Sequence, residues 1–208
     1  MAGGFRHAVL TAMLALLAAP LGVAAARAEP VRIVAIGDSN TYGYRVERTG
    51  TYPAQMEMQL RARGHDVTIV NAGHNGDMTA EGIARLDAAL TAGADAAIVF
   101  LGRNDWRKGV PASAIATNLD RIVADLRARG LEVLLVGFAP NDFSAVAERN
   151  GALYYPDFFE GVTTLGRKRG RFTVNGDIGR HLNAEGYAVV VGNMLPAVEQ
   201  LVDKASDE

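Results

Sequence analysis

VRIVAIGDSNTYGY, residues 31–44, contains the strand around which we expect the fold to be built. It opens with the apolar run at residues 33–36. A short run rich in β-branched residues and closed by glycine is typical of a strand buried on both faces. Gly37 permits a tight turn and places Ser39 just beyond the carboxyl end of that strand, where open α/β sheets bind ligands. Ser39 is therefore a candidate nucleophile, although Gly-Asp-Ser is also ordinary turn chemistry.

Length and composition indicate one globular domain. The chain has 208 residues, of which 49% are hydrophobic and 21% charged, so a sizeable core can form. A formal net charge of −2 gives no general attraction to nucleic acids or anionic membranes. The absence of cysteine excludes disulfides, thiolate nucleophiles and cysteine-based metal sites.

The N-terminus has the pattern of a secretory signal peptide. Basic residues at positions 6–7 precede an apolar stretch over residues 8–25 and the small-residue ending Ala26-Arg27-Ala28. A membrane anchor is the alternative, since the apolar stretch approaches spanning length. The small-residue ending favours cleavage. We therefore expect a signal peptide over residues 1–28 and a periplasmic or secreted domain over residues 29–208, with no stable membrane insertion after cleavage.

Apolar runs and helical periodicities alternate along the rest of the chain. We expect further strands at residues 67–70, 96–101, 133–138 and 152–155, separated by helices at residues 51–63, 79–90, 111–129 and 183–201. Regular alternation of this kind predicts a parallel sheet with helices on both faces. The expected fold is a single three-layer α/β/α sandwich with a five-stranded parallel sheet in flavodoxin-like order.

Four local features carry their own expectations. Thr79 is a suitable cap for the helix that follows it. Pro196 should kink or split the last helix, and the polar tail at residues 203–208 should fray. The crossover at residues 140–151 is close to the shortest that parallel strands allow, which would lower one wall of a cleft.

Polar loops follow three of the expected strands, at residues 37–40, 73–77 and 102–105. In a parallel sheet these loops share one edge and can converge on one crevice. Acyl transfer from an ester needs a nucleophile, a base and donors directed at the developing oxyanion. The three loops, together with a histidine from elsewhere in the chain, could supply all of these groups.

The groups that could meet these needs are few. Ser39 offers a hydroxyl and a backbone N–H, Gly76 a second N–H unobstructed by a side chain, and Asn104 a neutral NH₂ donor. His181, preceded by Asp177, is the candidate base ahead of the last helix. Each also has an ordinary explanation as a turn, loop or helix-start residue. His74 is more typical of a supporting or surface residue than of the base, and Asp38 of a turn brace.

The chain resembles the SGNH (GDSL-type) hydrolase family in the order of its sequence blocks, which are GDSN, NAGHNGD, GRND and then the Asp-and-His segment. The bacterial exported arylesterase, acyl thioesterase and lysophospholipase branch is the most similar, and the resemblance covers nearly the whole mature chain. It implies that Ser39 is the nucleophile and His181 the base. It also implies that Gly76 and Asn104 complete an oxyanion hole with the Ser39 N–H.

The resemblance further implies a hydrolase of carboxylic esters or thioesters that works through an acyl-enzyme, without cofactor or metal, on a small-molecule ester, thioester or lipid. The family's last block is usually Asp-x-x-His, whereas three residues separate Asp177 from His181 here. Residues four apart can still share a helical face. Two alternatives are a carbohydrate O-deacetylase that uses the same residues and a non-catalytic exported module that binds carbohydrate or lipid.

Overall fold

The computed structural model describes residues 1, 29–162, 170–175, 177 and 181–206. The segment expected to be a signal peptide lies outside these ranges except for its first residue, so it stays a prediction. Within the described residues, five strands form one parallel sheet in the order β2-β1-β3-β4-β5, which confirms the flavodoxin-like expectation. Their bounds are Val31–Gly37 (β1), Val67–Gly73 (β2), Ala96–Phe100 (β3), Glu132–Val136 (β4) and Leu153–Tyr155 (β5).

The three central strands form the middle of the core. Ile33 of β1 lies in register with Ile69 of β2 on one side and Ala96 of β3 on the other. Every residue of β3 and β4 is buried. Helices cover both faces of the sheet, so side chains on either face are removed from water. The continuous apolar runs in the sequence follow from this two-sided burial.

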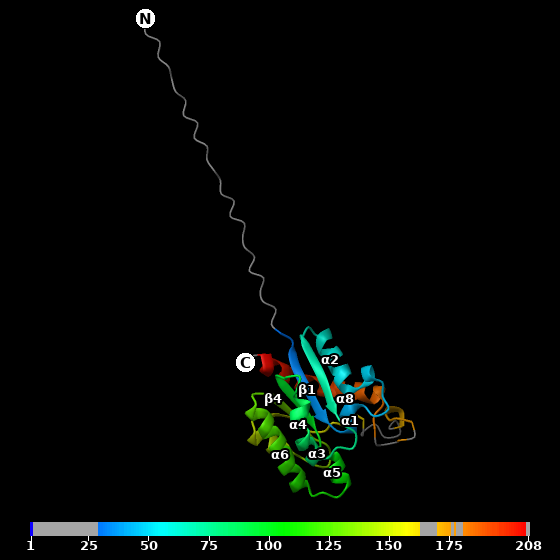
Figure 1. The fold of residues 1–208 in the computed structure, drawn as a ribbon. Helices are drawn as coiled ribbons and strands as arrows, with labels where there is room; N and C mark the ends of the chain where they lie inside the picture. Colours follow the sequence, from blue (N-terminus) through cyan, green and yellow to red (C-terminus); the bar gives the residue numbers. More distant parts are fainter. Residues whose placement is uncertain (2–28, 163–169, 176, 178–180, 207–208) are drawn as a thin grey trace.

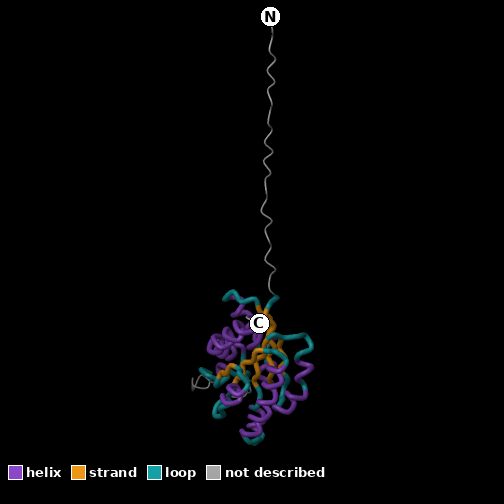
Figure 2. The backbone as a smooth tube through the Cα atoms, turned by 90° about the vertical axis from the view of Figure 1, so that its left-hand side faces the viewer, coloured by secondary structure: helices purple, strands orange, loops and turns teal. Residues whose placement is uncertain are grey.

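Helices form a layer on each face of the sheet, as Figures 1 and 2 show. One layer consists of α2 (Tyr52–Ala62) and α8 (Ala184–Ser206), which pack against each other. The other consists of α3 (Thr79–Ala84), α4 (Leu86–Ala89), α6 (Ala112–Ala128) and α7 (Ser144–Arg149). The short helices α1 (Ser39–Tyr42) and α5 (Arg103–Arg107) follow β1 and β3, and the 3₁₀ turn η1 (Arg48–Gly50) precedes α2.

Helix α6 matches the expected buried stripe. It presents apolar side chains at helical spacing toward the sheet. Gly130, with φ 83°, follows its last turn. The fully buried members of the stripe are Ile115, Leu119, Ile122 and Leu126. Helical periodicity in the sequence therefore identified both the element and the face that it buries.

The helix after β2 differs from its expectation. It is broken at Arg85 into α3 and α4, and its N-cap is Met78 rather than Thr79. Thr79 instead donates from its backbone N and its hydroxyl to the buried carboxylate of Asp105, at 2.9 and 2.6 Å. The Arg85 side chain donates to the Asp77 carboxylate, and the backbone leaves helical geometry at Arg85.

Helix α8 corrects the expectation that Pro196 splits it, because it runs through Pro196 and continues to Ser206. A proline inside a helix leaves the carbonyl four residues earlier without its partner. Here both Pro196 and Gly192 lie on the exposed side, where water can solvate that carbonyl. The opposite side buries Leu195, Val198 and Leu201, so packing holds the helix together past the proline. The helix includes residues 203–206 of the tail that we expected to fray, and residues 207–208 lie outside the described residues.

Strand β2 lies at one edge of the sheet, and side chains of α2 bind its outer backbone groups. The Ile69 N–H donates to Glu57 Oε2 at 2.7 Å. Arg61 Nε donates to the Val67 carbonyl at 2.8 Å. These bonds satisfy polar groups that an edge strand otherwise presents to solvent.

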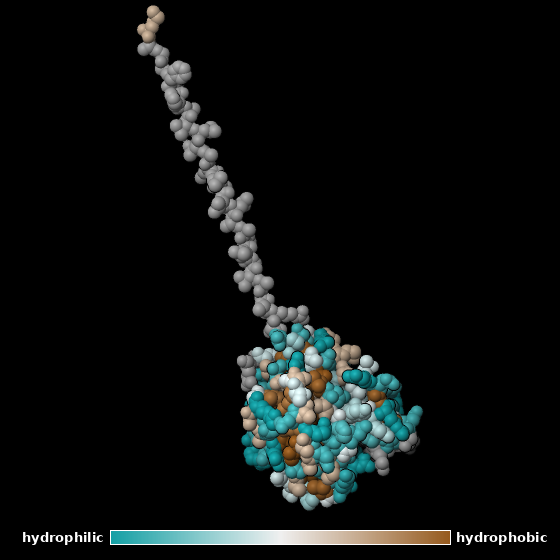
Figure 3. Space-filling model, in the orientation of Figure 1, coloured by the Kyte–Doolittle hydropathy of each residue, from teal (hydrophilic) through white to brown (hydrophobic). Residues whose placement is uncertain are grey.

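The face of the molecule shown in Figure 3 is mainly hydrophilic, with small and separated hydrophobic patches. Scattered apolar side chains of this kind are normal on a globular protein. None of the helices in the described part of the chain is both long and apolar enough to span a membrane.

Candidate active site

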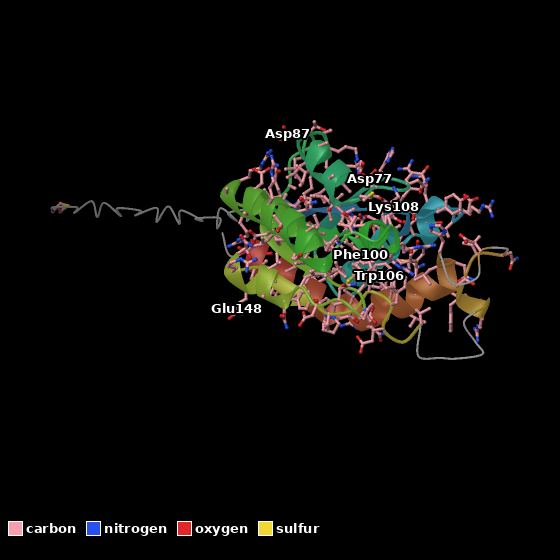
Figure 4. All side chains as sticks on the ribbon, turned by 90° about the horizontal axis from the view of Figure 1, so that it is seen from below. Asp77, Asp87, Phe100, Trp106, Lys108 and Glu148 are labelled. Atoms are coloured by element: carbon pink, nitrogen blue, oxygen red, sulfur yellow. The ribbon has the colours of Figure 1, made fainter. Side chains whose placement is uncertain are left out.

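The carboxyl ends of β1, β2 and β3 meet at the end of the sheet that carries α1 and α5, the lower end in Figure 1. Two glycines allow this close approach. A Cβ on Gly73 would lie 2.2 Å from the Tyr42 nitrogen, and one on Gly37 would lie 2.0 Å from Thr41 Oγ1. Figure 4 looks from this end and labels Asp77, Trp106 and Lys108. The three polar loops therefore converge as expected.

Ser39 is the first residue of α1, and the turn before it is fixed by Asp38. The Asp38 carboxylate accepts the Asn40 backbone N–H at 2.8 Å, as an N-cap does, and also accepts Asn40 Nδ2 at 3.1 Å. This confirms the expected brace. Ser39 itself is only 7% exposed, and its hydroxyl contacts His181. Burial raises the pKa of Asp38, and the hydrogen bonds from Asn40 oppose that shift.

His181 bridges the nucleophile and an acid. Its Nε2 lies 2.8 Å from Ser39 Oγ. Its Nδ1 contacts Asp177 Oδ2 on the opposite side of the ring. The two side chains are 19% and 15% exposed, so this contact is largely shielded from water. The structure thus brings Ser39, His181 and Asp177 together in one chain of hydrogen bonds despite the longer spacing of the last two.

The backbone around His181 is anchored to the segment before it. The His181 carbonyl accepts the Val174 N–H at 3.0 Å, and the Asn183 N–H donates to Phe172 O at 3.0 Å. Asn183 Oδ1 accepts the Gly186 N–H at 2.9 Å, which confirms Asn183 as the cap of α8. His181 is therefore held by a short backbone bridge that leads directly into the long helix α8.

Asn104 connects the other two loops. Its Nδ2 donates to the Asp77 carbonyl at 2.9 Å and lies 3.3 Å from Asp38 Oδ2. Gly102, with φ 97°, turns the chain from β3 into α5 and so directs Asn104 toward β1 and β2. The amide lies between the loops that follow both neighbouring strands, because each of its two bonds goes to a different loop.

Gly76 is exposed on the loop after β2 and has φ 83°. A Cβ at this position would meet no heavy atom within 4 Å. The expectation that glycine keeps the backbone N–H unobstructed stays a prediction. The structure adds a second reason for glycine, because other residues rarely adopt this left-handed backbone conformation.

His74 lies on the same loop, and its side chain contacts Asp77. Its Nδ1 lies 2.8 Å from Asp77 Oδ1, and its side chain is 63% exposed. Asp77 is buried and also accepts Arg85 Nε at 2.7 Å. His74 is thus a surface residue that helps to hold the loop, which agrees with the expectation from the sequence.

Two contacts at the site were not expected from the sequence. Tyr44 packs on His181 with ring centroids 4.6 Å apart and an interplanar angle of 44°. Asp105, next to Asn104, ties α5 to the start of α3 through Thr79. Both contacts join segments that are distant in the sequence, so neither periodicity nor spacing could have indicated them.

A separate groove of about 740 Å³ follows the outer edge of β2 toward Tyr42 and Gly43. None of the five candidate site residues lines it. In the described part of the chain, no group of three or more His, Asp or Glu side chains could hold a metal ion. The groups that meet at the candidate site are a hydroxyl, an imidazole, a carboxylate and amide donors.

The profile of the GDSL-like Lipase/Acylhydrolase family matches residues 35–189. The chain belongs to this family. The match spans all three polar loops and both His181 and Asp177, so it confirms the resemblance to SGNH (GDSL-type) hydrolases.

Individual relatives agree with this assignment. The chain is 31% identical over 144 residues to "Esterase TesA" of Pseudomonas aeruginosa, covering 62% of this chain and 72% of that protein. It is 30% identical over 106 residues to an "Arylesterase" of Vibrio mimicus, covering 50% of this chain and only about half, 53%, of that protein. A crystal structure of TesA superposes with a TM-score of 0.70 at 27% identity, covering 82% of this chain and 99% of that one.

Proposed function

We propose that this protein hydrolyses carboxylic esters or thioesters through a covalent acyl-enzyme on Ser39. One observation carries the proposal: Ser39 Oγ lies 2.8 Å from His181 Nε2, and Asp177 contacts the other ring nitrogen. A nucleophile, a base and a group that orients the base are the three parts that activate a serine.

In the first half of the reaction, Ser39 Oγ attacks the acyl carbon while His181 Nε2 takes the hydroxyl proton. Asp177 accepts the Nδ1–H, which fixes the tautomer that leaves Nε2 free to act as the base. The imidazolium then gives its proton to the leaving alcohol or thiol as the bond to the acyl carbon breaks. The acyl group remains on Ser39 as an ester.

In the second half, His181 takes a proton from water, and the resulting hydroxide equivalent attacks the acyl carbon. Collapse of the second tetrahedral intermediate releases the carboxylic acid, and the proton returns to Ser39 Oγ. Each residue ends in the state in which it began.

Three donors can stabilise the oxyanion formed in both halves: the backbone N–H groups of Ser39 and Gly76, and Nδ2 of Asn104. The Asn104 amide already donates to Asp77 O at 2.9 Å, and its contact with Asp38 is longer, at 3.3 Å. Engagement of an oxyanion therefore requires only the longer contact to give way. The shorter bond keeps the amide in position while this happens.

The relatives named esterase and arylesterase support an ester substrate, and a relative named thioesterase and lysophospholipase supports the inclusion of thioesters and lipids. We assign the mature protein to the periplasm or the extracellular space, because the pattern of residues 1–28 is that of a cleaved leader.

Labelling with a fluorophosphonate tests the proposal. The wild type should react and lose activity, whereas Ser39→Ala should neither react nor turn over nitrophenyl esters. Asp87→Asn, a change at an exposed acid on α4, should react like the wild type. Esterase activity in purified Ser39→Ala would refute the mechanism. A panel of nitrophenyl esters, acyl-CoAs, lysophospholipids and acetylated sugars would then define the substrate class.

A further inference from the structure

Tyr44 lies in the turn that leaves α1, and its backbone is tied to the nucleophile. The Ser39 carbonyl accepts the N–H groups of both Gly43 and Tyr44, at 3.0 and 3.1 Å. Gly43 has φ 86°, so the chain reverses there and brings the Tyr44 ring over His181. The position of the ring is therefore set by the same residue whose hydroxyl bonds to the imidazole.

The next residue braces this ring. Arg45 is the one non-glycine residue with positive φ in the described part of the chain, at 59°. Its guanidinium carbon lies 5.2 Å from the centroid of the Tyr44 ring, within the range of a cation–π contact. A left-handed conformation is unfavourable for a residue with a side chain, so the surrounding structure must hold it in place. The strained residue lies directly beside the ring that touches His181.

We propose that Tyr44 is a positioning residue for hydrolysis: its ring holds the His181 imidazole against Ser39 and stabilises the imidazolium that forms as Ser39 loses its proton. This inference rests on the proposed function. An aromatic face attracts a cation within about 6 Å of its centroid, and the two centroids here are 4.6 Å apart. The attraction is absent for the neutral ring and grows as charge develops, so it favours the transition state over the ground state.

Other charged groups also act on His181. Asp177 contacts it from its own segment, and Asp38 attracts it from the turn after β1. Arg45 contributes a positive charge beside Tyr44, and Arg103 contributes one near Asp38. Replacing Tyr44 leaves Asp177, Asp38 and Arg103 in place and removes only the ring that Arg45 contacts, so a change in the behaviour of His181 would report the loss of the ring together with that contact.

The test compares Tyr44→Leu with Tyr44→Phe, which keeps the ring. The leucine variant should lose about threefold to thirtyfold in kcat with little change in KM, whereas the phenylalanine variant should stay close to the wild type. The acidic limb of the kcat/KM profile should move to lower pH in the leucine variant, because the imidazolium has lost a stabilising contact. Tyr42→Leu, the same change at a tyrosine that is 51% exposed, is the matched control.

A second measurement does not depend on turnover. In Ser39→Ala protein, the imidazole resonance of His181 should titrate with a lower midpoint when Tyr44→Leu is added, and circular dichroism should show an unchanged fold. An unchanged midpoint and an unchanged acidic limb would overturn the inference. A loss of kcat in Tyr44→Leu without either shift would also overturn it, because it would show only a steric role. Full activity in Ser39→Ala or His181→Ala would instead refute the proposed function.

Discussion

Replacing Asp177 by Asn tests the residue whose spacing departs from the family pattern. The substitution keeps the size of the side chain and removes its charge, so His181 loses the anion that stabilises its imidazolium. Two unit charges about 4 Å apart at an effective dielectric of about 20 attract by about 4 kcal/mol. That energy corresponds to about 10³ in rate. Side-chain exposures of 15% and 19% allow some screening, so we expect a loss of about 10²- to 10³-fold in kcat.

The assay is the hydrolysis of a nitrophenyl ester over a range of concentrations, which separates kcat from KM. The KM should change little, because the charge on His181 exists only in the transition state. Asp87→Asn is the control, since Asp87 is an exposed acid and pairs with Arg129 at the surface. His181→Ala should lose at least as much as Asp177→Asn. If Asp177→Asn works at the wild-type rate while His181→Ala is inactive, the reaction depends on Ser39 and His181 alone.

Two further predictions concern the loops around Ser39. Asn104→Ala should lower kcat by about 10²- to 10³-fold, the usual effect of removing one oxyanion donor, and a rise in KM alone would show that Asn104 binds substrate instead. Asp38 has a pKa raised by burial, so its contribution to stability is complete below its ordinary pKa of 3.8 and is lost as the pH rises through the higher folded value. As the pH rises from about 4 to about 7, the free energy of unfolding of Asp38→Asn should therefore increase relative to that of the wild type, as measured by urea unfolding. The same difference between the two proteins at both pH values would contradict the reasoning.

The sheet could be predicted from the sequence because parallel strands buried on both faces are continuously apolar. Ser39 and Asn104 could be found for a related reason, since polar loops at the carboxyl ends of such strands must share one edge. In these cases the local sequence and the tertiary structure favour the same outcome. The prediction therefore needed no knowledge of individual contacts.

The expectations that were wrong are those in which a tertiary contact overrides the preference of the local sequence. Thr79 has the side chain of a helix cap, but Asp105 takes both of its donors. Pro196 should disturb a helix, but buried residues on either side of it keep α8 continuous. Tyr44 had no visible role, because its partner lies on the segment before the last helix. Neither propensity nor spacing encodes contacts of this kind.

The bonds from Glu57 and Arg61 to β2 have a consequence for the protein in concentrated solution. An outer strand with free N–H and C=O groups can recruit a strand from another molecule and so begin an ordered aggregate. Here a carboxylate and a guanidinium from α2 already occupy two of those positions, at Ile69 N and Val67 O. A second molecule would have to displace both charged groups before it could add to the sheet. The helix that covers one face of the sheet thereby also limits self-association at its margin.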